Sequence, residues 1–162
     1  MSVGVRVRPL RVDEREWVRA VMLERWGDET AVGHGLVWRP AELDAFVAQD
    51  DDGTRVGVLT YDAREDALEI VTIDAFRPRE GIGTALMLAA IERAHDAAAQ
   101  RVVVMTTNDN EPAIAFYEHL GFRVTEVREG AIEEARAIKP SIPPTGVGGT
   151  PITDEVLLEL RP

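Results

Sequence analysis

Apolar residues in the first part of the chain recur with two different periods. Residues 3–7 place a valine at every second position, which predicts a half-buried strand. Asp13, followed three residues later by Glu16, is typical of a helix start. The apolar positions that then follow at helical spacing are Trp17, Val18, Val21 and Met22. We therefore expect a strand and then a helix over about residues 13–25.

Three short strands separated by acidic turns are expected next. Residues 26–40 contain three glycines and end in a proline, so we expect mostly loop there. Asp51-Asp52-Gly53 and the acidic stretch 62–66 are turn signals between apolar runs. The expected strands are Phe46–Gln49, Arg55–Tyr61 and Leu68–Ala75. Short turns join antiparallel neighbours, and the pattern therefore predicts a meander.

The second half of the chain returns to helical spacing. Residues 81–100 are rich in alanine and leucine with one apolar face, and Glu111–Leu120 follows Asn110 as a cap and precedes Gly121. The strands expected around these helices are Arg101–Thr106, Phe122–Val127 and Val156–Leu160. With no repeat and no linker, the order predicts one α+β domain over residues 1–162. A proline- and glycine-rich insertion, at about residues 130–151, precedes its last strand.

Composition narrows the class of protein. The 162 residues are 45% apolar and include no cysteine, which excludes disulfides, thiolate zinc sites and a cysteine nucleophile. The N-terminus lacks a signal-peptide pattern, and no apolar run approaches a membrane span, so we expect a cytoplasmic protein without a membrane partner. The net charge of −11 disfavours nucleic acid and modestly favours a cationic partner. Simple solubility is the alternative explanation of that charge.

The run Gly81-Ile82-Gly83-Thr84 lies between a predicted strand and a predicted helix. Free amides and the helix dipole at such a start attract phosphate oxygens, and glycine lets a ligand approach the backbone. A tight turn without a ligand is the alternative. The run fits neither a P-loop nor a dinucleotide fingerprint, since it lacks the lysine of the first and the third glycine of the second.

A second motif lies about one helix and one strand further on. It consists of Asn110, Ala113, Tyr117, Gly121 and Phe122 in the spacing Asn-x-x-Ala-x-x-x-Tyr-x-x-x-Gly-Phe. Together with the glycine run it resembles the GNAT superfamily of acetyl-CoA-dependent N-acetyltransferases. The resemblance spans most of the chain and implies a mixed, mostly antiparallel sheet of about seven strands with about four helices. It also allows a homodimer.

The resemblance implies a place for acetyl-CoA. Backbone groups of Ile73, Asp74 and Ala75 would pair with the pantetheine arm, and Asn110 and Tyr117 would lie near the cofactor, Tyr117 beside its sulfur. The pyrophosphate would bind the amides of Gly81, Ile82, Gly83 and Thr84. The family's arginine or glutamine falls on Pro78, which has neither a polar side chain nor an amide hydrogen. We expect Arg79 or Arg77 to substitute for it.

Amine acetylation needs a proton acceptor, because an alkylamine with a pKa of about 10.4 is almost fully protonated at pH 7. Glu69 is our candidate base and Asp74 the alternative. Strict alternation puts Glu69, Val71 and Ile73 on one face of their strand and Ile70, Thr72 and Asp74 on the other. Tyr117 is the candidate acid for the departing thiolate, with core packing as its alternative role. The histidines have no partners at the spacing of metal ligands, so we expect no metal.

We therefore expect an enzyme that moves an acetyl group from acetyl-CoA to a primary amine by direct attack in a ternary complex. The acceptor would be a small-molecule amine or a peptide or protein amine, bound near residues 26–40 and 131–151. A non-catalytic acyl-CoA-binding or sensing module is one alternative. An interaction domain that binds no cofactor is another.

Overall fold

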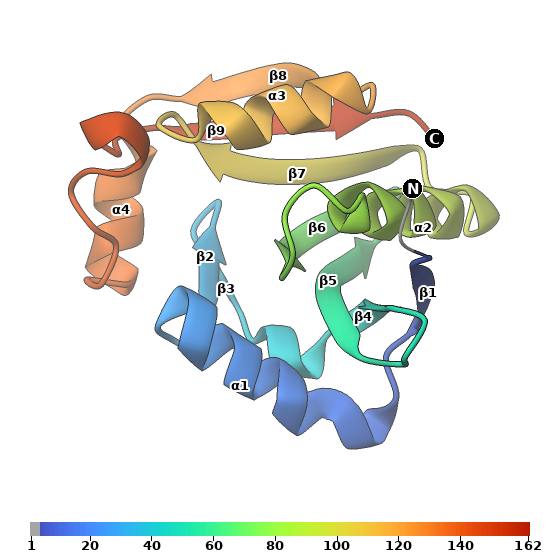
Figure 1. Ribbon diagram of the computed structural model, residues 1–162. Helices are drawn as coiled ribbons and strands as arrows, with labels where there is room; N and C mark the ends of the chain where they lie inside the picture. Colours follow the sequence, from blue (N-terminus) through green and yellow to red (C-terminus); the bar gives the residue numbers. More distant parts are fainter. Residues whose placement is uncertain (1–3) are drawn as a thin grey trace. The chain divides into compact units, whose positions relative to one another are not determined.

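The computed structural model describes residues 4–162, so Val3, the first valine of the predicted alternation, lies outside the described part. Seven strands form one mixed, mostly antiparallel sheet in the order β1-β4-β5-β6-β7-β9-β8, and β2 and β3 form a separate pair (Figure 1). The described residues also form four α-helices. The predicted fold class is confirmed. By its contacts the chain divides into two compact units, which we describe one at a time.

The first unit contains the chain up to Ala31, Arg39–Val102 and Pro162. Its four strands pair in antiparallel fashion as β1-β4-β5-β6, and α1 begins two residues later than expected after a short 3-10 turn, η1. The predicted meander is confirmed. The elements are β1 (Arg6–Pro9), η1 (Val12–Glu14), α1 (Arg15–Trp26), η2 (Pro40–Glu42), β4 (Asp44–Gln49), β5 (Arg55–Arg64), β6 (Ala67–Ala75) and α2 (Ile82–Asp96).

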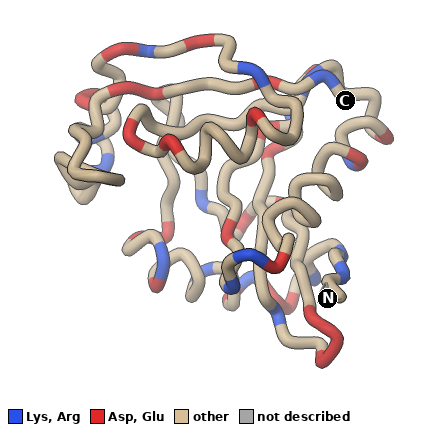
Figure 2. Tube along the Cα trace, turned by 45° about the horizontal axis from the view of Figure 1, so that its top comes forward, with Lys and Arg blue, Asp and Glu red and all other residues tan. Residues whose placement is uncertain are grey.

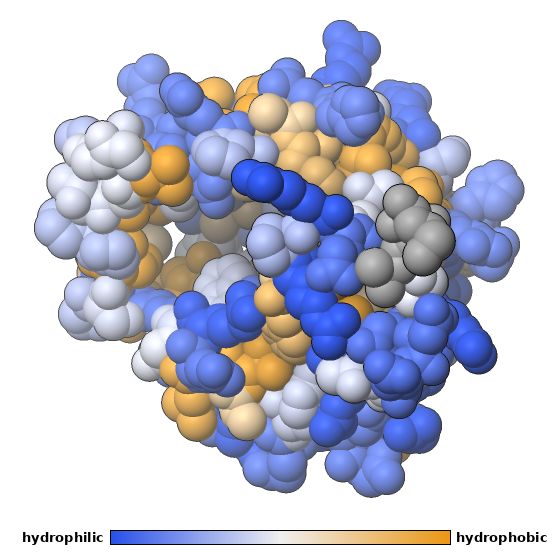
Figure 3. Space-filling model, viewed as in Figure 1, coloured by the Kyte–Doolittle hydropathy of each residue, from blue (hydrophilic) through white to orange (hydrophobic). Residues whose placement is uncertain are grey.

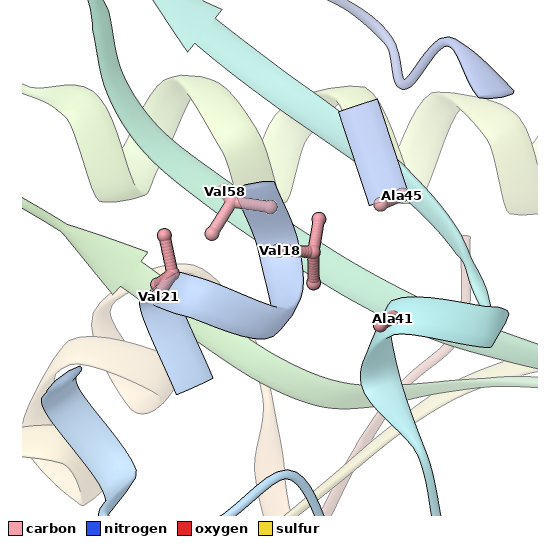
Figure 4. Close-up of a cluster of buried hydrophobic side chains, with 5 residues drawn as sticks. All are labelled: Val18, Val21, Ala41, Ala45 and Val58. Carbon is pink, nitrogen blue, oxygen red and sulfur yellow. The ribbon is translucent and has the colours of Figure 1, made fainter. Parts of the chain in front are cut away.

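In this unit α1 and α2 pack on opposite faces of the meander. Val58 of β5 lies in one buried cluster with Val18 and Val21 of α1, as Figure 4 shows. Its neighbour Gly57 faces the other way, towards Ile82 at the start of α2. A β-carbon on Gly57 would lie only 2.6 Å from a methyl carbon of Ile82, so the missing side chain lets α2 approach the sheet closely.

Strand β6 contains a β-bulge that changes which residues share a face. Thr60 pairs with Thr72, but the next residue, Tyr61, pairs with Ile70, so Val71 is an extra residue without a cross-strand partner. Since Glu69, Thr72 and Asp74 lie opposite alternate residues of β5, they share one face, the one covered by α1. The predicted alternation, with Glu69 on the face of Ile73, is therefore wrong, because it assumed an unbroken period of two.

The second unit contains Val32–Trp38 and Val103–Arg161. Residues 31–38, expected to be mostly loop, form a hairpin in which His34 and Gly35 both have positive φ, 50° and 74°. The insertion before the last strand contains a helix, α4, that was not expected. The elements that lie wholly or mostly in this unit are β2 (Ala31–Gly33), β3 (Leu36–Trp38), β7 (Arg101–Thr107), α3 (Glu111–His119), β8 (Arg123–Arg128), α4 (Ala131–Ile138), η3 (Val147–Gly149) and β9 (Glu155–Leu160).

Candidate functional site

The turn between β6 and α2 has the geometry of an anion-binding helix start. Arg79 and Gly81 both have left-handed backbones, with φ of 62° and 74°, and Gly81 caps α2. The Ala85 amide is bonded to the Gly81 carbonyl at 3.0 Å, so the amides of Ile82, Gly83 and Thr84 precede the first helical hydrogen bond. The buried Ile82 side chain fixes this end of α2 against the sheet.

The two arginines proposed to compensate for Pro78 differ in their surroundings. The Arg77 guanidinium lies 3.0 Å from an Asp50 carboxylate oxygen. Burial would raise the pKa of Asp50, but hydrogen bonds from the Thr54 and Asp52 amides and from Arg77 lower it below its usual value. Arg77 thus forms an ion pair with the turn that follows β4. The Arg79 side chain is exposed.

Asp74, near the end of β6, receives a hydrogen bond from α1. The Trp26 indole nitrogen lies 3.2 Å from one carboxylate oxygen and 3.1 Å from the other. Burial raises the pKa of Asp74, and the Trp26 hydrogen bond and the nearby Arg25 charge reduce that rise. Ile73 and Ala75 flank it, and Ala75 pairs with Gly57.

Glu69 is more deeply buried than Asp74, and only 2% of it is exposed. Its carboxylate forms an ion pair with Arg64 of the neighbouring strand β5. Close by on the same face, the Thr60 and Thr72 hydroxyl oxygens are 2.6 Å apart and form a buried hydrogen bond. The carboxylate is therefore already committed to a cation.

The second motif lies in the second unit. The Asn110 side-chain oxygen accepts a hydrogen bond from the Ala113 amide at 3.3 Å, so the predicted cap of α3 is confirmed. Tyr117 is buried, and its ring lies 5.5 Å from Phe116 and 5.9 Å from Phe122, measured between centroids. The Phe122 amide also donates to the Tyr117 carbonyl at 3.0 Å. This packing holds the tyrosine ring in one place.

Sequence reasoning missed three polar residues of the second unit that organise the insertion. Asn108 accepts from the Thr153 and Asp154 amides, and buried Asp109 accepts from the Val147 amide at 3.0 Å. Arg136 of α4 donates to the carbonyls of Pro143 and Ile152. The Asn-Asp-Asn run at residues 108–110 is a turn signal that pointed to this junction. The proline- and glycine-rich segment is thus held at several points along its length.

Two further properties concern the whole described chain. Within residues 4–162 no three histidine, aspartate or glutamate side chains gather as a metal site would require. None of the helices in that range combines the length and the apolar character needed to cross a membrane.

Comparison with known proteins gives consistent matches. The model of the acetyltransferase (GNAT) family matches residues 11–122. The uncharacterized protein YxbD of Bacillus subtilis is 37% identical over 144 residues, which cover 89% of this chain and 91% of that protein. An IAA acetyltransferase from Bacillus cereus superposes with a TM-score of 0.74 at 19% identity, covering 98% and 100% of the two chains. A Bacillus subtilis acetyltransferase in complex with CoA superposes with a TM-score of 0.68 at 18% identity, covering 99% of both chains.

Proposed function

Because the chain belongs to the acetyltransferase (GNAT) family, we propose that it transfers an acetyl group from acetyl-CoA to a primary amine. The observation that carries the proposal is the turn at Arg79 and Gly81, which opens α2 with free amides after an apolar strand. A structural neighbour with the same fold is a complex with CoA. The family therefore supports the class of reaction, and this turn supports the choice of cofactor.

In this proposal the cofactor lies along the end of β6 and over the start of α2. Backbone groups of Ile73, Asp74 and Ala75 pair with the pantetheine arm as a further strand would. The pyrophosphate binds the amides of Gly81, Ile82, Gly83 and Thr84, with Arg79 supplying a charge-assisted contact. Asn110 contacts the cofactor from the cap of α3.

The chemistry is direct attack in a ternary complex. The amine nitrogen forms a bond to the thioester carbonyl carbon, the carbon–sulfur bond breaks, and the thiolate takes a proton that Tyr117 donates. The ammonium group loses two protons: the first goes to a carboxylate, and the second, released once the carbon–nitrogen bond has formed, restores the proton of Tyr117. With no cysteine in the chain, an acyl-cysteine intermediate cannot form. The acceptor is a small-molecule amine or a peptide or protein amine, and the net charge of −11 favours a cationic one.

The test is release of free thiol from acetyl-CoA in the presence of a panel of primary amines. Tyr117→Phe should lower kcat about 10²-fold, the usual range for a lost general acid, while calorimetry shows unchanged CoA affinity. The matched control is Tyr61→Phe at the only other tyrosine, which stacks on Phe46 in the first unit. It should keep its activity.

Two outcomes would overturn the proposal. Wild-type protein that binds CoA but acetylates no amine would favour the non-catalytic acyl-CoA-binding or sensing module. Parallel lines in two-substrate kinetics would contradict the ternary complex, which predicts intersecting lines.

A further inference from the structure

Buried carboxylates of the first unit are paired with arginines. Glu14 lies 2.7 Å from Arg8, Asp50 lies 3.0 Å from Arg77, and Glu69 pairs with Arg64. These pairings are expected, because a charge withdrawn from water needs a partner of opposite sign. Half-buried Asp74 departs from this rule, since its hydrogen-bond donor among the described residues is the neutral indole of Trp26.

Arg25 of α1, whose charge reduces the rise in the pKa of Asp74, has another contact. The Arg25 guanidinium lies over the Phe76 ring, 4.4 Å from its centroid. That ring is fixed in turn by an edge contact with Trp17 at 6.1 Å. Arg25 therefore contributes to the local potential, but among residues 4–162 it forms no ion pair with Asp74 within 4 Å. The carboxylate is left with capacity for one further cation.

The position of Asp74 suits an external cation. The bulge at Val71 places Asp74 on the α1 face, and it is the second-last residue of β6, next to exposed Ala75. Its donor, Trp26, ends α1 and is 40% exposed. An exposed indole beside a carboxylate offers a ring face and a negative charge together, the combination that binds an organic ammonium group.

We infer that Asp74 binds the ammonium group of the acceptor and takes its proton as the amine attacks, and that Trp26 is the positioning residue that holds Asp74. This inference rests on the proposed acetyl transfer and names its acceptor class as a cationic primary amine. Two nitrogen–hydrogen bonds break as the ammonium group becomes an amide. The first proton goes to an Asp74 oxygen and frees the lone pair that forms the carbon–nitrogen bond, and the second restores the proton that Tyr117 gives to the thiolate. Burial, which raises the pKa of Asp74, brings the carboxylate nearer to the working range of a general base.

The first experiment is Asp74→Asn, assayed with the best primary alkylamine found in the panel. We expect kcat/KM for the amine to fall about 10²-fold or more at pH 7, with unchanged CoA affinity. Without the base, the rate should follow the free amine in solution and rise about tenfold per pH unit towards the pKa of the amine. In wild-type protein, kcat/KM should instead become independent of pH once Asp74 is deprotonated. The matched control is Asp13→Asn, which removes one carboxylate that is 82% exposed.

The second experiment is Trp26→Phe, which keeps a ring and removes the N–H donor. Arg25 and Trp26 of α1 are the groups that lower the pKa of Asp74, so losing the indole bond should raise it. The acid limb of the kcat/KM profile should therefore move to higher pH, while the melting temperature stays close to that of the wild type. A purely structural tryptophan would leave that limb unmoved, and this result would overturn its positioning role.

The outcomes separate this inference from the proposed function. If wild-type protein acetylates no amine, the proposed function fails and this inference fails with it. If wild-type protein is active and Asp74→Asn keeps its rate, only the inference fails. If Glu69→Gln alone shows the pH-dependent defect, Glu69 is the base and the inference is wrong. If Asp74→Asn does not fold, the pH profile of Trp26→Phe decides whether Asp74 or Glu69 is the base.

Discussion

Arg79 shows at the scale of one residue how this chain differs from its family pattern. Pro78 takes the position where the resemblance expects a polar side chain, and the next residue is an arginine with φ of 62°. A left-handed backbone costs a non-glycine residue about 1–2 kcal/mol. Backbone strain that a folded protein retains is a reason to look for a function, and here the candidate function is phosphate binding.

Two variants separate the charge of Arg79 from its backbone. Arg79→Gly and Arg79→Ala both remove the guanidinium, but only glycine adopts the left-handed turn without cost. We expect both to lower CoA affinity about tenfold, in line with the loss of one charge-assisted hydrogen bond. The glycine variant should be the more stable of the two by about 1 kcal/mol. Calorimetry with CoA and thermal unfolding measure the two effects, and wild-type affinity in Arg79→Gly would refute the charge contact.

At the scale of elements, the approach of α2 to the sheet sets where the turn at Arg79 and Gly81 lies. Gly57 of β5 makes that approach possible, because a β-carbon there would meet Ile82 at 2.6 Å and the Asp74 carbonyl oxygen at 2.8 Å. Ile82 is also the first residue of α2. The packing of one helix residue and the position of the proposed cofactor amides are therefore coupled.

Gly57→Ala tests this coupling. The added methyl group should displace the start of α2, destabilise the fold by about 1–3 kcal/mol and weaken CoA binding. Gly53→Ala is the comparison, since Gly53 has open space around it and a φ of 80°. It should cost stability through backbone strain alone and leave CoA affinity unchanged. Equal losses of affinity in the two variants, measured by calorimetry, would contradict the coupling.

Across the whole molecule, charged side chains are plentiful and acidic ones are in excess, but several buried carboxylates are paired with arginines. Acidic and basic residues both occur along much of the chain, and polar residues cover much of the face drawn in Figure 3 (Figures 2 and 3). Glu14 is the clearest case, with only 4% of its side chain exposed and two arginines, Arg8 and Arg55, within 3.2 Å. Hydrogen bonding from Arg8 lowers the pKa of Glu14 to about 2.

This pairing predicts how stability depends on pH. The pKa of Glu14 is lower in the folded than in the unfolded chain, where it is 4.5. Its contribution is therefore complete above pH 4.5 and is lost as the pH falls towards 2. The urea midpoint should drop over this window in wild-type protein and drop less in Glu14→Gln. An equal pH dependence of the two midpoints would show that Glu14 is not responsible.

The sequence predicted those parts of the fold that obey one simple period or carry a strong cap. The antiparallel meander and α3 with its Asn110 cap belong here. The hairpin at residues 31–38 was missed because each of its strands has only three residues. Helix α4 was missed because the prolines and glycines that follow it dominate the composition of the insertion.

At the candidate site, the sequence identified the turn and both carboxylates but not their partners. Alternation alone cannot reveal the bulge at Val71, which brings Glu69 and Asp74 to the same face. Nor can local spacing show that Arg64 pairs with Glu69, or that Trp26, 48 residues before Asp74, donates to it. These contacts depend on tertiary packing. They distinguish Glu69, which is paired with an arginine, from Asp74, which is bonded to a neutral donor.

The bulge in β6 also bears on which insertions and deletions this strand tolerates. Deleting one residue from a regular strand turns all the residues on one side of the cut to the opposite face. Deleting Val71 would remove the residue that lacks a cross-strand partner, so Ile70 and Thr72 would become neighbours opposite Tyr61 and Thr60. Every other side chain of the strand would keep its face. Natural relatives one residue shorter at this position would therefore preserve both the core and the orientation of Asp74.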